Sequence, residues 1–174
     1  DDESILLAWR NNPSVRKYSL TTDYIDQNMH SEWFKARLNE IQIQPLLIFI
    51  WNHKEIGMVR LDKLNSLSKV FEISILVGES FQNRGFATSM ISQSLEFAKL
   101  ELSADEVRAT IHIENIYSIQ LFTKLNFLSI SKKDSVDQYT ESLYNRQRLT
   151  IDTLEGTEDS VMERRRDQLL IGAR

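Results

Sequence analysis

The chain has 174 residues, of which 41% are hydrophobic and 26% charged, as expected for a single globular domain with its own core. Cysteine is absent, which excludes a disulfide framework, thiolate metal ligands and a cysteine nucleophile. The formal net charge of -4 argues against a general nucleic-acid-binding protein, and the longest apolar run, residues 45–51, is too short to cross a bilayer. We therefore expect a cytoplasmic protein with neither a nucleic-acid nor a membrane partner.

The N-terminal third combines two helical patterns with a hairpin pattern. Asp2 can cap a first helix, which the Asn11-Asn12-Pro13 turn ends. A second helix is expected to start near Asp26, with four apolar side chains on one side: Met29, Trp33, Phe34 and Leu38. Residues 46–51 and 56–61 are apolar runs around a short polar turn, and they predict two antiparallel strands.

The middle of the chain alternates strand and helix patterns. Residues 71–77 place apolar side chains at every second position, which predicts a strand, and residues 86–98 repeat them at helical spacing. A strand at 107–113, a helix at 115–125 and a strand from Phe127 are expected to follow.

The C-terminal end is more polar. Residues 134–146 predict a loop that is helical in part, and residues 148–154 predict the last strand. Ser160 and Glu163 have the spacing of a capping box, so a short helix through Ile171 is expected. We therefore divide the chain into a domain at 1–154 and a C-terminal helical extension at 155–174.

The turn after the strand at 71–77 suits an anion, because backbone N–H groups at a helix start have no partner within the helix. Asn83, Arg84, Gly85 and Phe86 can present such groups, and Ala87 keeps the first turn small. Many unrelated proteins connect a strand to a helix through small residues, so the residues alone are compatible with a phosphate site and with a purely structural turn. The spacing matches neither a dinucleotide fold nor a P-loop.

Two motifs resemble a known family. Gln82-x-x-Gly85-x-Ala87 after an apolar strand resembles the loop that holds the acetyl-CoA pyrophosphate in the GNAT superfamily of N-acetyltransferases. Residues 115–127 resemble the second signature of that superfamily, an asparagine that opens a helix ending at a Gly-Phe pair, although Asn126 replaces the glycine.

Residues 7–16 and 30–34 are similar to the sugar-nucleotide N-acetyltransferases of pseudaminic acid biosynthesis, and less closely to the ribosomal-protein N-terminal acetyltransferases. The resemblance implies an α/β (α+β) fold: a single GNAT-type domain with a mixed, mostly antiparallel sheet and helices on both faces. The first strand of the superfamily is missing ahead of the first helix. We therefore expect part of a longer polypeptide, with fusion to an upstream domain as one option, and a homodimer stays open as well.

The resemblance also implies acetyl-CoA as co-substrate and no metal. Backbone groups near Leu76 and Val77 would pair with its pantetheine arm, and Asn115 would contact the arm besides capping a helix. The pyrophosphate would lie on six consecutive residues: Gln82, Asn83, Arg84, Gly85, Phe86 and Ala87. The three histidines are scattered and predict no metal site.

Glu72 is the candidate general base. It shares a strand face with Val70, Ser74 and Leu76, and a carboxylate among apolar neighbours suits proton abstraction from an amine. The residues alone are also compatible with a half-exposed, solubilising glutamate. Related sugar acetyltransferases have a glutamate at the matching place, which favours the base.

The proton donor for the departing thiolate is harder to assign. The superfamily commonly has a tyrosine seven residues after the helix-opening asparagine, where this chain has Phe122, which cannot donate a proton. We expect Phe122 to line the cofactor site and Ser118, one turn earlier, to substitute as acid, with Tyr117 as an alternative. Ser118 could instead bond the preceding turn. A thiol pKa of about 8.5 also permits release without a protein acid.

Four residues are candidates for the acceptor site: Trp9, Arg10, Asn11 and His30. A tryptophan beside an arginine can stack on a base or bind a phosphate, and His30 begins the helix where the sugar-nucleotide branch builds its acceptor pocket. A core tryptophan, a surface arginine and a structural histidine are the plainer alternatives.

We therefore expect an acetyl-CoA-dependent N-acetyltransferase that acts on a small-molecule primary amine, the 4-amino group of a nucleotide-activated amino-deoxy sugar. A protein N-terminus is the alternative acceptor. A noncatalytic acyl-CoA-binding module is the alternative of another class, in which Phe122 marks a lost acid.

Overall fold

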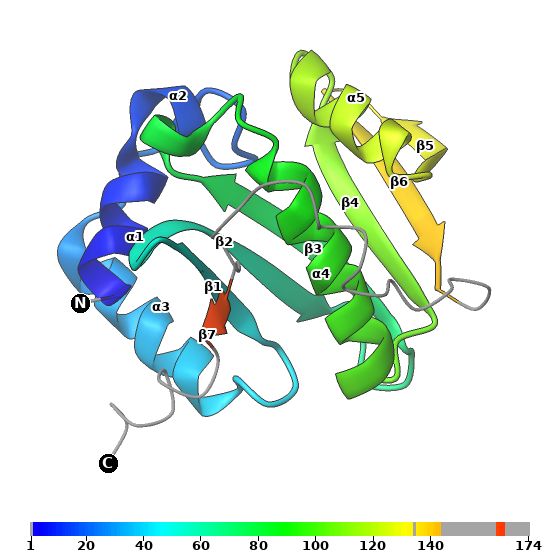
Figure 1. The fold of residues 1–174 in the computed structure, drawn as a ribbon, viewed down its shortest axis with the longest axis horizontal. Helices are drawn as coiled ribbons and strands as arrows, with labels where there is room; N and C mark the ends of the chain where they lie inside the picture. Colours follow the sequence, from blue (N-terminus) through cyan, green and yellow to red (C-terminus); the bar gives the residue numbers. More distant parts are fainter. Residues whose placement is uncertain (1, 134, 144–162, 166–174) are drawn as a thin grey trace.

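The structure, a computed structural model, describes residues 2–133, 135–143 and 163–165. Its helical elements are α1 (Asp2–Asn11), α2 (Pro13–Arg16), α3 (Gln27–Asn39), the short 3-10 helix η1 (Glu79–Phe81), α4 (Phe86–Glu101) and α5 (Ile116–Lys124). Its strands are β1 (Leu46–Trp51), β2 (Lys54–Lys63), β3 (Val70–Val77), β4 (Glu106–His112), β5 (Leu128–Lys133), β6 (Val136–Ser142) and β7 (Glu163–Arg165). The strands form one sheet in the order β5-β6-β4-β3-β2-β1-β7 (Figure 1).

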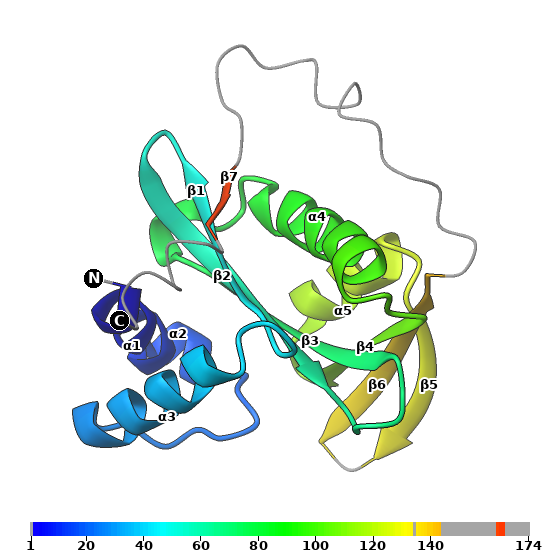
Figure 2. The same cartoon turned by 90° about the horizontal axis from the view of Figure 1, so that it is seen from below.

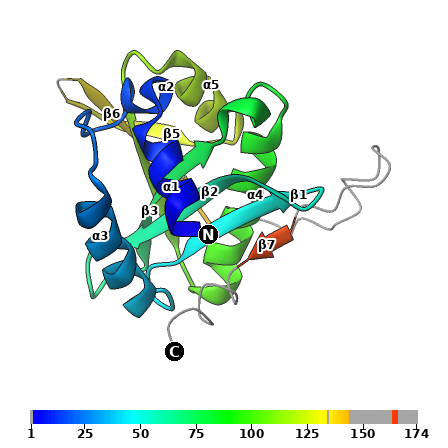
Figure 3. The same ribbon diagram turned by 90° about the vertical axis from the view of Figure 1, so that its left-hand side faces the viewer.

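Helices cover both faces of this sheet (Figure 2). The larger apolar cluster lies between the sheet and helices α4 and α5, and includes Leu95 and Phe122. The smaller cluster lies under α1 and α3, which cross the other face (Figure 3), and includes Leu6 and Leu76. All strand pairs are antiparallel except β3 with β4, so the predicted mixed, mostly antiparallel sheet with helices on both faces is confirmed.

Local sequence signals explain most element boundaries. The β1–β2 turn uses Asn52 and His53 at φ 49° and 59°, a backbone that suits a two-residue hairpin. Asp26 caps α3, because its carboxylate accepts the N–H groups of Asn28 and Met29. The predicted apolar side of α3 is wrong at Met29, which is 59% exposed. The buried side chains of this helix are His30, Phe34 and Arg37, at the spacing of one helical face.

The C-terminal predictions were wrong where the structure tests them. Residues 136–142 form β6 instead of a loop, because backbone pairing with β4 and β5 on both sides outweighs the polar composition. The segment around Glu163 forms β7, which pairs with the outer edge of β1, instead of a helix. The strand expected at 148–154, the rest of the expected helix and the boundary at 154 lie outside the described residues.

Candidate active site

The parallel strands β3 and β4 pair over only three positions, from Val70 with Glu106 to Glu72 with Arg108. Beyond that point the strands separate (Figure 1). The last five residues of β3 therefore have no strand partner on the β4 side within the described part of the chain. We call the gap between the separating strands the wedge. An extended molecule could pair with β3 there, and Glu72 lies at its closed end.

The direction of the β3 backbone can be read from its pairing with β2. The Gly78 N–H donates to the Ile56 carbonyl at 2.8 Å, and antiparallel pairs alternate between bonded and non-bonded positions. This alternation turns the backbone of Leu76 toward β2 and that of Ile75 and Val77 toward the wedge. The Val77 carbonyl accepts the Gln82 side-chain amide at 3.1 Å, which ties the following loop to the strand end.

The loop from Gln82 to Ala87 opens helix α4 with bare backbone groups. Asn83 and Gly85 both adopt left-handed φ angles, 57° and 82°. Gly85 is the N-cap of α4, and among the described residues no side-chain cap bonds the first amides of the helix. A side chain at Gly85 would meet no atom within 4 Å, so the space beside the loop is open. These features fit the predicted phosphate turn.

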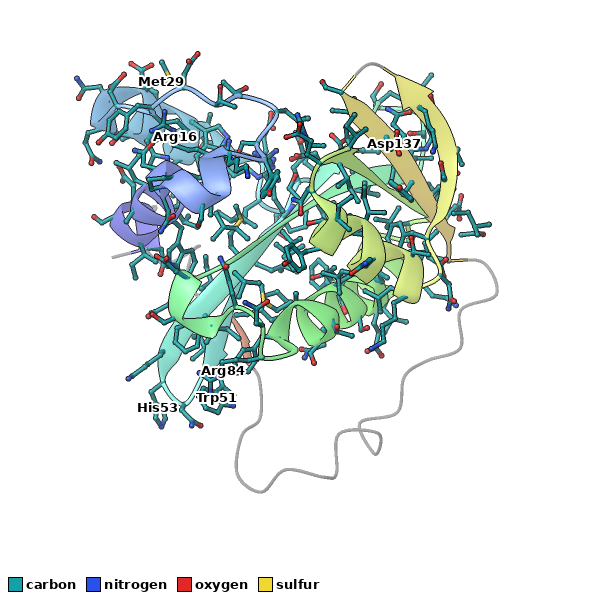
Figure 4. All side chains as sticks on the ribbon, turned by 90° about the horizontal axis from the view of Figure 1, so that it is seen from above. Arg16, Met29, Trp51, His53, Arg84 and Asp137 are labelled. Carbon is teal, nitrogen blue, oxygen red and sulfur yellow. The ribbon has the colours of Figure 1, made fainter. Side chains whose placement is uncertain are left out.

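Arg84 is held against three aromatic rings. Its guanidinium carbon lies 5.0 Å from the ring centre of Trp51, 5.3 Å from that of Phe86 and 5.9 Å from that of Phe81. Figure 4 shows Arg84 and Trp51 together beside the tip of the β1–β2 hairpin. Cation–π contacts of this kind orient the guanidinium, and Arg84 has no carboxylate partner among the described residues.

Glu72 lies in the central strand, as predicted, and is half-buried on the sheet face that α1 and α3 cover in part. Its Oε1 accepts a hydrogen bond from the Thr110 hydroxyl of β4 at 2.6 Å. Among the described residues this is the one side chain that bonds the Glu72 carboxylate, and the other oxygen, Oε2, accepts no side-chain hydrogen bond from them.

A second carboxylate on the same face is already engaged. Glu106 accepts Arg108 Nε at 2.6 Å and the Thr140 hydroxyl at 2.7 Å. The hydrogen bond from Arg108 and then that from Thr140 lower the pKa of Glu106 below its ordinary value. The Arg108 side chain is therefore bound to Glu106, although the Arg108 backbone lies opposite Glu72.

The lowered pKa of Glu106 gives a pH prediction. A depressed pKa contributes stability that is fully present above the ordinary value of 4.5 and is lost as pH falls through the folded-state value. Glu106→Gln should therefore lower the melting temperature near neutral pH and flatten its fall in acid. Thermal unfolding of both proteins from pH 7 to pH 3 measures this, and parallel curves for both would contradict the assignment.

The candidate residues at and in helix α5 differ from one another in exposure and in contacts. Asn115 is its N-cap and accepts the Ser118 N–H at 3.2 Å, as predicted for the cap. Ser118 is half-buried, and Tyr117 is 78% exposed. Phe122 is 3% exposed and packs edge-on against Phe127 with ring centres 4.8 Å apart. Phe122 is therefore packed in the core, and its expected contact with the cofactor stays a prediction.

The four acceptor-site candidates are not brought together. Asn11 uses both ends of its side-chain amide on the Ile25 backbone, at 2.7 and 2.9 Å, so it fixes the loop before α3. His30 is 2% exposed, and its Nε2 lies 3.0 Å from the Glu3 carbonyl. Both residues therefore have structural roles in this conformation, which is the plainer alternative for His30.

Trp9 lies beside the end of β3, and Arg10 bonds the loop after α2. A methyl group at Gly78, where β3 ends, would come within 3.2 Å of Trp9 Nε1, so the indole covers that turn. Arg10 donates to the Ser19 hydroxyl at 3.1 Å. Burial, and then the like charge of Arg60, lower the pKa of Arg10.

Arg60 belongs to a polar cluster next to Glu72. Its Nε lies 2.7 Å from Asp62 Oδ2 in an ion pair, although the angle is not that of a hydrogen bond. Asp62 also pairs with Arg37, whose pKa is lowered by burial and raised in part by Asp62. The strand register places Arg60 opposite Ser74 and Asp62 opposite Glu72. Two arginines therefore share Asp62, while Arg10 has no carboxylate partner among the described residues.

Comparison with known proteins gives the family. The profile of the acetyltransferase (GNAT) domain matches residues 1–128. The chain belongs to the GNAT acetyltransferase family. GNAT membership makes the protein an acetyl-CoA-dependent N-acetyltransferase by class.

Its relatives within the GNAT family differ in acceptor. The chain is 20% identical over 118 residues to a spermidine N(1)-acetyltransferase of Vibrio cholerae, covering 68% of each chain. It is 30% identical over 83 residues to an N-alpha-acetyltransferase of Saccharolobus solfataricus, covering 47% of this chain and 50% of that protein. Neither relative is named as a sugar-nucleotide enzyme.

Solved structures agree on the GNAT fold. The structure of spermidine N-acetyltransferase from Vibrio cholerae in complex with CoA and spermine superimposes with a TM-score of 0.74 at 16% identity, covering 81% of this chain and 89% of that one. A domain from Methanocaldococcus jannaschii gives 0.70 at 25% identity, covering 82% and 92%. A ribosomal-protein-alanine N-acetyltransferase from Brucella melitensis gives 0.68 at 18% identity, covering 82% and 94%.

Sequence reasoning missed two residues of this GNAT site. Thr110 lies on the same face of β4 as Arg108, but its bond to Glu72 depends on the parallel register of two strands far apart in the chain. Trp51 ends an apolar strand and gives no signal that it contacts Arg84. In the described residues, no group of acidic, histidine or cysteine side chains could hold a metal, and no helix is long and apolar enough to span a membrane.

Proposed function

We propose that this GNAT protein transfers the acetyl group of acetyl-CoA directly to a primary amine, with Glu72 as general base. The observation that carries the proposal is the position of the Glu72 carboxylate at the closed end of the β3–β4 wedge, beside unpaired β3 backbone. A base must lie within hydrogen-bonding reach of the attacking nitrogen, and the free Oε2 meets this requirement if the thioester enters the wedge.

Acetyl-CoA would lie along the open edge of β3. The backbone groups of Ile75 and Val77 point into the wedge and would pair with the pantetheine arm as an added strand does. The pyrophosphate would take the amides of residues 83–87, where helix α4 begins without a side-chain cap. Val77 would then give up its bond with Gln82 to a group of the cofactor.

The reaction needs three events. The amine nitrogen attacks the thioester carbonyl carbon as Glu72 takes its proton, directly or through water, and the carbon–sulfur bond then breaks. A backbone N–H at the wedge would stabilise the charge on the carbonyl oxygen. Ser118 or water would protonate the departing thiolate, because Phe122 has no hydroxyl and is buried.

Arg84 is expected to contribute to cofactor binding through its fixed guanidinium. Replacing it with glutamine should raise the KM for acetyl-CoA about tenfold and leave kcat unchanged, as loss of one charge-assisted hydrogen bond predicts. Arg16→Gln is the matched control, since Arg16 also lies over a ring, that of Tyr24, at 5.8 Å. Equal KM values for the two variants would show that Arg84 does not contact the cofactor.

For the acceptor, we propose an amine that carries negative charge, such as the 4-amino group of a nucleotide-activated amino-deoxy sugar. Arg10 and Arg60 support an anionic acceptor, because Arg60 lies opposite Ser74 on the sheet face that bears Glu72 and its positive charge acts on Arg10. A polyamine or a basic peptide would instead need additional carboxylates there. The relatives that act on spermidine and on protein N-termini make those two acceptors the alternatives. Such a reaction belongs in the cytoplasm, where acetyl-CoA is available.

Thiol release from acetyl-CoA with three acceptors tests the proposal: a UDP-linked 4-amino-4,6-dideoxy sugar, spermidine, and a peptide with a free N-terminus. The expected result is turnover with the sugar nucleotide that falls at least tenfold in Arg10→Gln. Turnover with spermidine or the peptide alone would keep the chemistry and overturn the acceptor. Binding of acetyl-CoA without release in any well would favour a noncatalytic acyl-CoA-binding module.

A further inference from the structure

We infer that Thr110 positions the catalytic carboxylate: its hydroxyl fixes Glu72 Oε1 and so directs Oε2 toward the acceptor amine. This inference rests on the proposed role of Glu72 as base. It assigns a function to a residue of β4 that would touch neither acetyl-CoA nor the amine.

The first observation is the geometry of the bond. Thr110 Oγ1 donates to Glu72 Oε1 at 2.6 Å, the ordinary length of a charge-assisted hydroxyl–carboxylate hydrogen bond, which is stronger than a bond between neutral groups. Threonine is restricted at χ1 because it is branched at Cβ, so its hydroxyl is a rigid donor. A carboxylate bound in this way cannot turn about its terminal torsion without losing the bond.

The second observation is where the bond lies. The last backbone pair between β3 and β4 joins Glu72 to Arg108, and Thr110 is the next residue on that face of β4. The hydroxyl therefore reaches back across the point where the strands separate. Past the last ladder pair, Thr110 links the two strands at the closed end of the wedge, behind the carboxylate that it holds.

The third observation is the absence of a competing donor. Arg108 is paired with Glu72 across the two strands, but its guanidinium donates to Glu106 instead. Glu106 also accepts the Thr140 hydroxyl. Asp62, opposite Glu72 on β2, is paired with Arg37 and Arg60. Within the described residues, Thr110 alone bonds the Glu72 carboxylate. Its removal should therefore free that carboxylate to adopt other orientations.

Two substitutions separate positioning from packing. Thr110→Val keeps the shape of the side chain and removes the hydroxyl, whereas Thr110→Ser keeps the hydroxyl. With the acceptor panel described above, we expect Thr110→Val to lower kcat about tenfold at an unchanged KM for acetyl-CoA, since one positioning hydrogen bond is lost. Thr110→Ser should stay within about threefold of the wild type, and circular dichroism checks that both variants fold.

A double-mutant cycle with Glu72→Gln gives the decisive readout. If Thr110 acts through Glu72, Thr110→Val should have no further effect in the Glu72→Gln protein, because the base is already lost. An equal loss in both backgrounds, or full activity of Thr110→Val alone, would overturn the inference. Failure of the Thr110 inference and failure of the proposed base give different results. If Glu72 is not the base, Glu72→Gln itself keeps its turnover.

Discussion

Glu72→Gln is expected to lower turnover by about 10²- to 10⁴-fold and to leave acetyl-CoA binding nearly unchanged. Glutamine keeps the size of the side chain and can still accept the Thr110 hydroxyl, but its amide cannot take a proton from an amine. The proposed base lies at the closed end of the wedge, away from the loop at 83–87 that would bind the pyrophosphate. The loss should therefore appear in kcat, and calorimetric titration with acetyl-CoA should give a similar Kd for both proteins.

The matched control for this change is Glu106→Gln. Glu106 lies on the same face of the sheet, but Arg108 and Thr140 already hold its carboxylate. We expect this variant to keep its turnover at neutral pH. Retained turnover in Glu72→Gln at saturating acceptor would refute the base assignment, and equal losses in both variants would indicate that the sheet, and not the base, had been damaged.

The largest effect on stability is expected from Gly57→Ala. A methyl group at Gly57 would overlap the carbonyl oxygen of Leu76 and would come within 2.8 Å of Met90 Cε. Met90 can move, but the Leu76 carbonyl is backbone in the central strand, so the β2–β3 pairing would have to shift. Overpacking of this kind costs roughly 3 kcal/mol, and it would displace the wall of the wedge as well.

Urea unfolding followed by fluorescence measures this loss, with Gly78→Ala as the control. A methyl group at Gly78 has its nearest contact at 3.2 Å, with the Trp9 side chain, so that variant should lose much less stability. Similar midpoints for Gly57→Ala and wild type would show that β2 and β3 are not packed as closely at this point as the structure places them.

The strongest local patterns predicted the parts of the fold that depend on neighbouring residues. The alternation in 71–77 and the helical spacing from Phe86 gave β3, the turn and α4, and Asp26 marked the start of α3 correctly. The hairpin at Asn52 and His53 also followed from local sequence. In these cases the signals in the sequence act within a few residues of one another.

The errors arose where distant contacts decide the outcome. β6 has few apolar residues, yet two neighbouring strands satisfy its backbone, and buried Asp137 lies beside the Tyr139 hydroxyl at 3.4 Å. Periodicity alone could not choose between His30 and Met29, which are adjacent in sequence but lie on different sides of α3. The Thr110 bond to Glu72 spans 38 residues and requires the parallel register, which single-strand patterns do not contain.

A crystal structure of the protein with CoA would show whether the cofactor enters the wedge. We expect the pantetheine arm between β3 and β4, paired with the backbone of Val77 and Ile75, and the pyrophosphate on the amides of residues 83–87. The sulfur would then lie on the same side of the wedge as Glu72 Oε2. A cofactor bound elsewhere, with the Val77 carbonyl still bonded to Gln82, would contradict both the site and the mechanism.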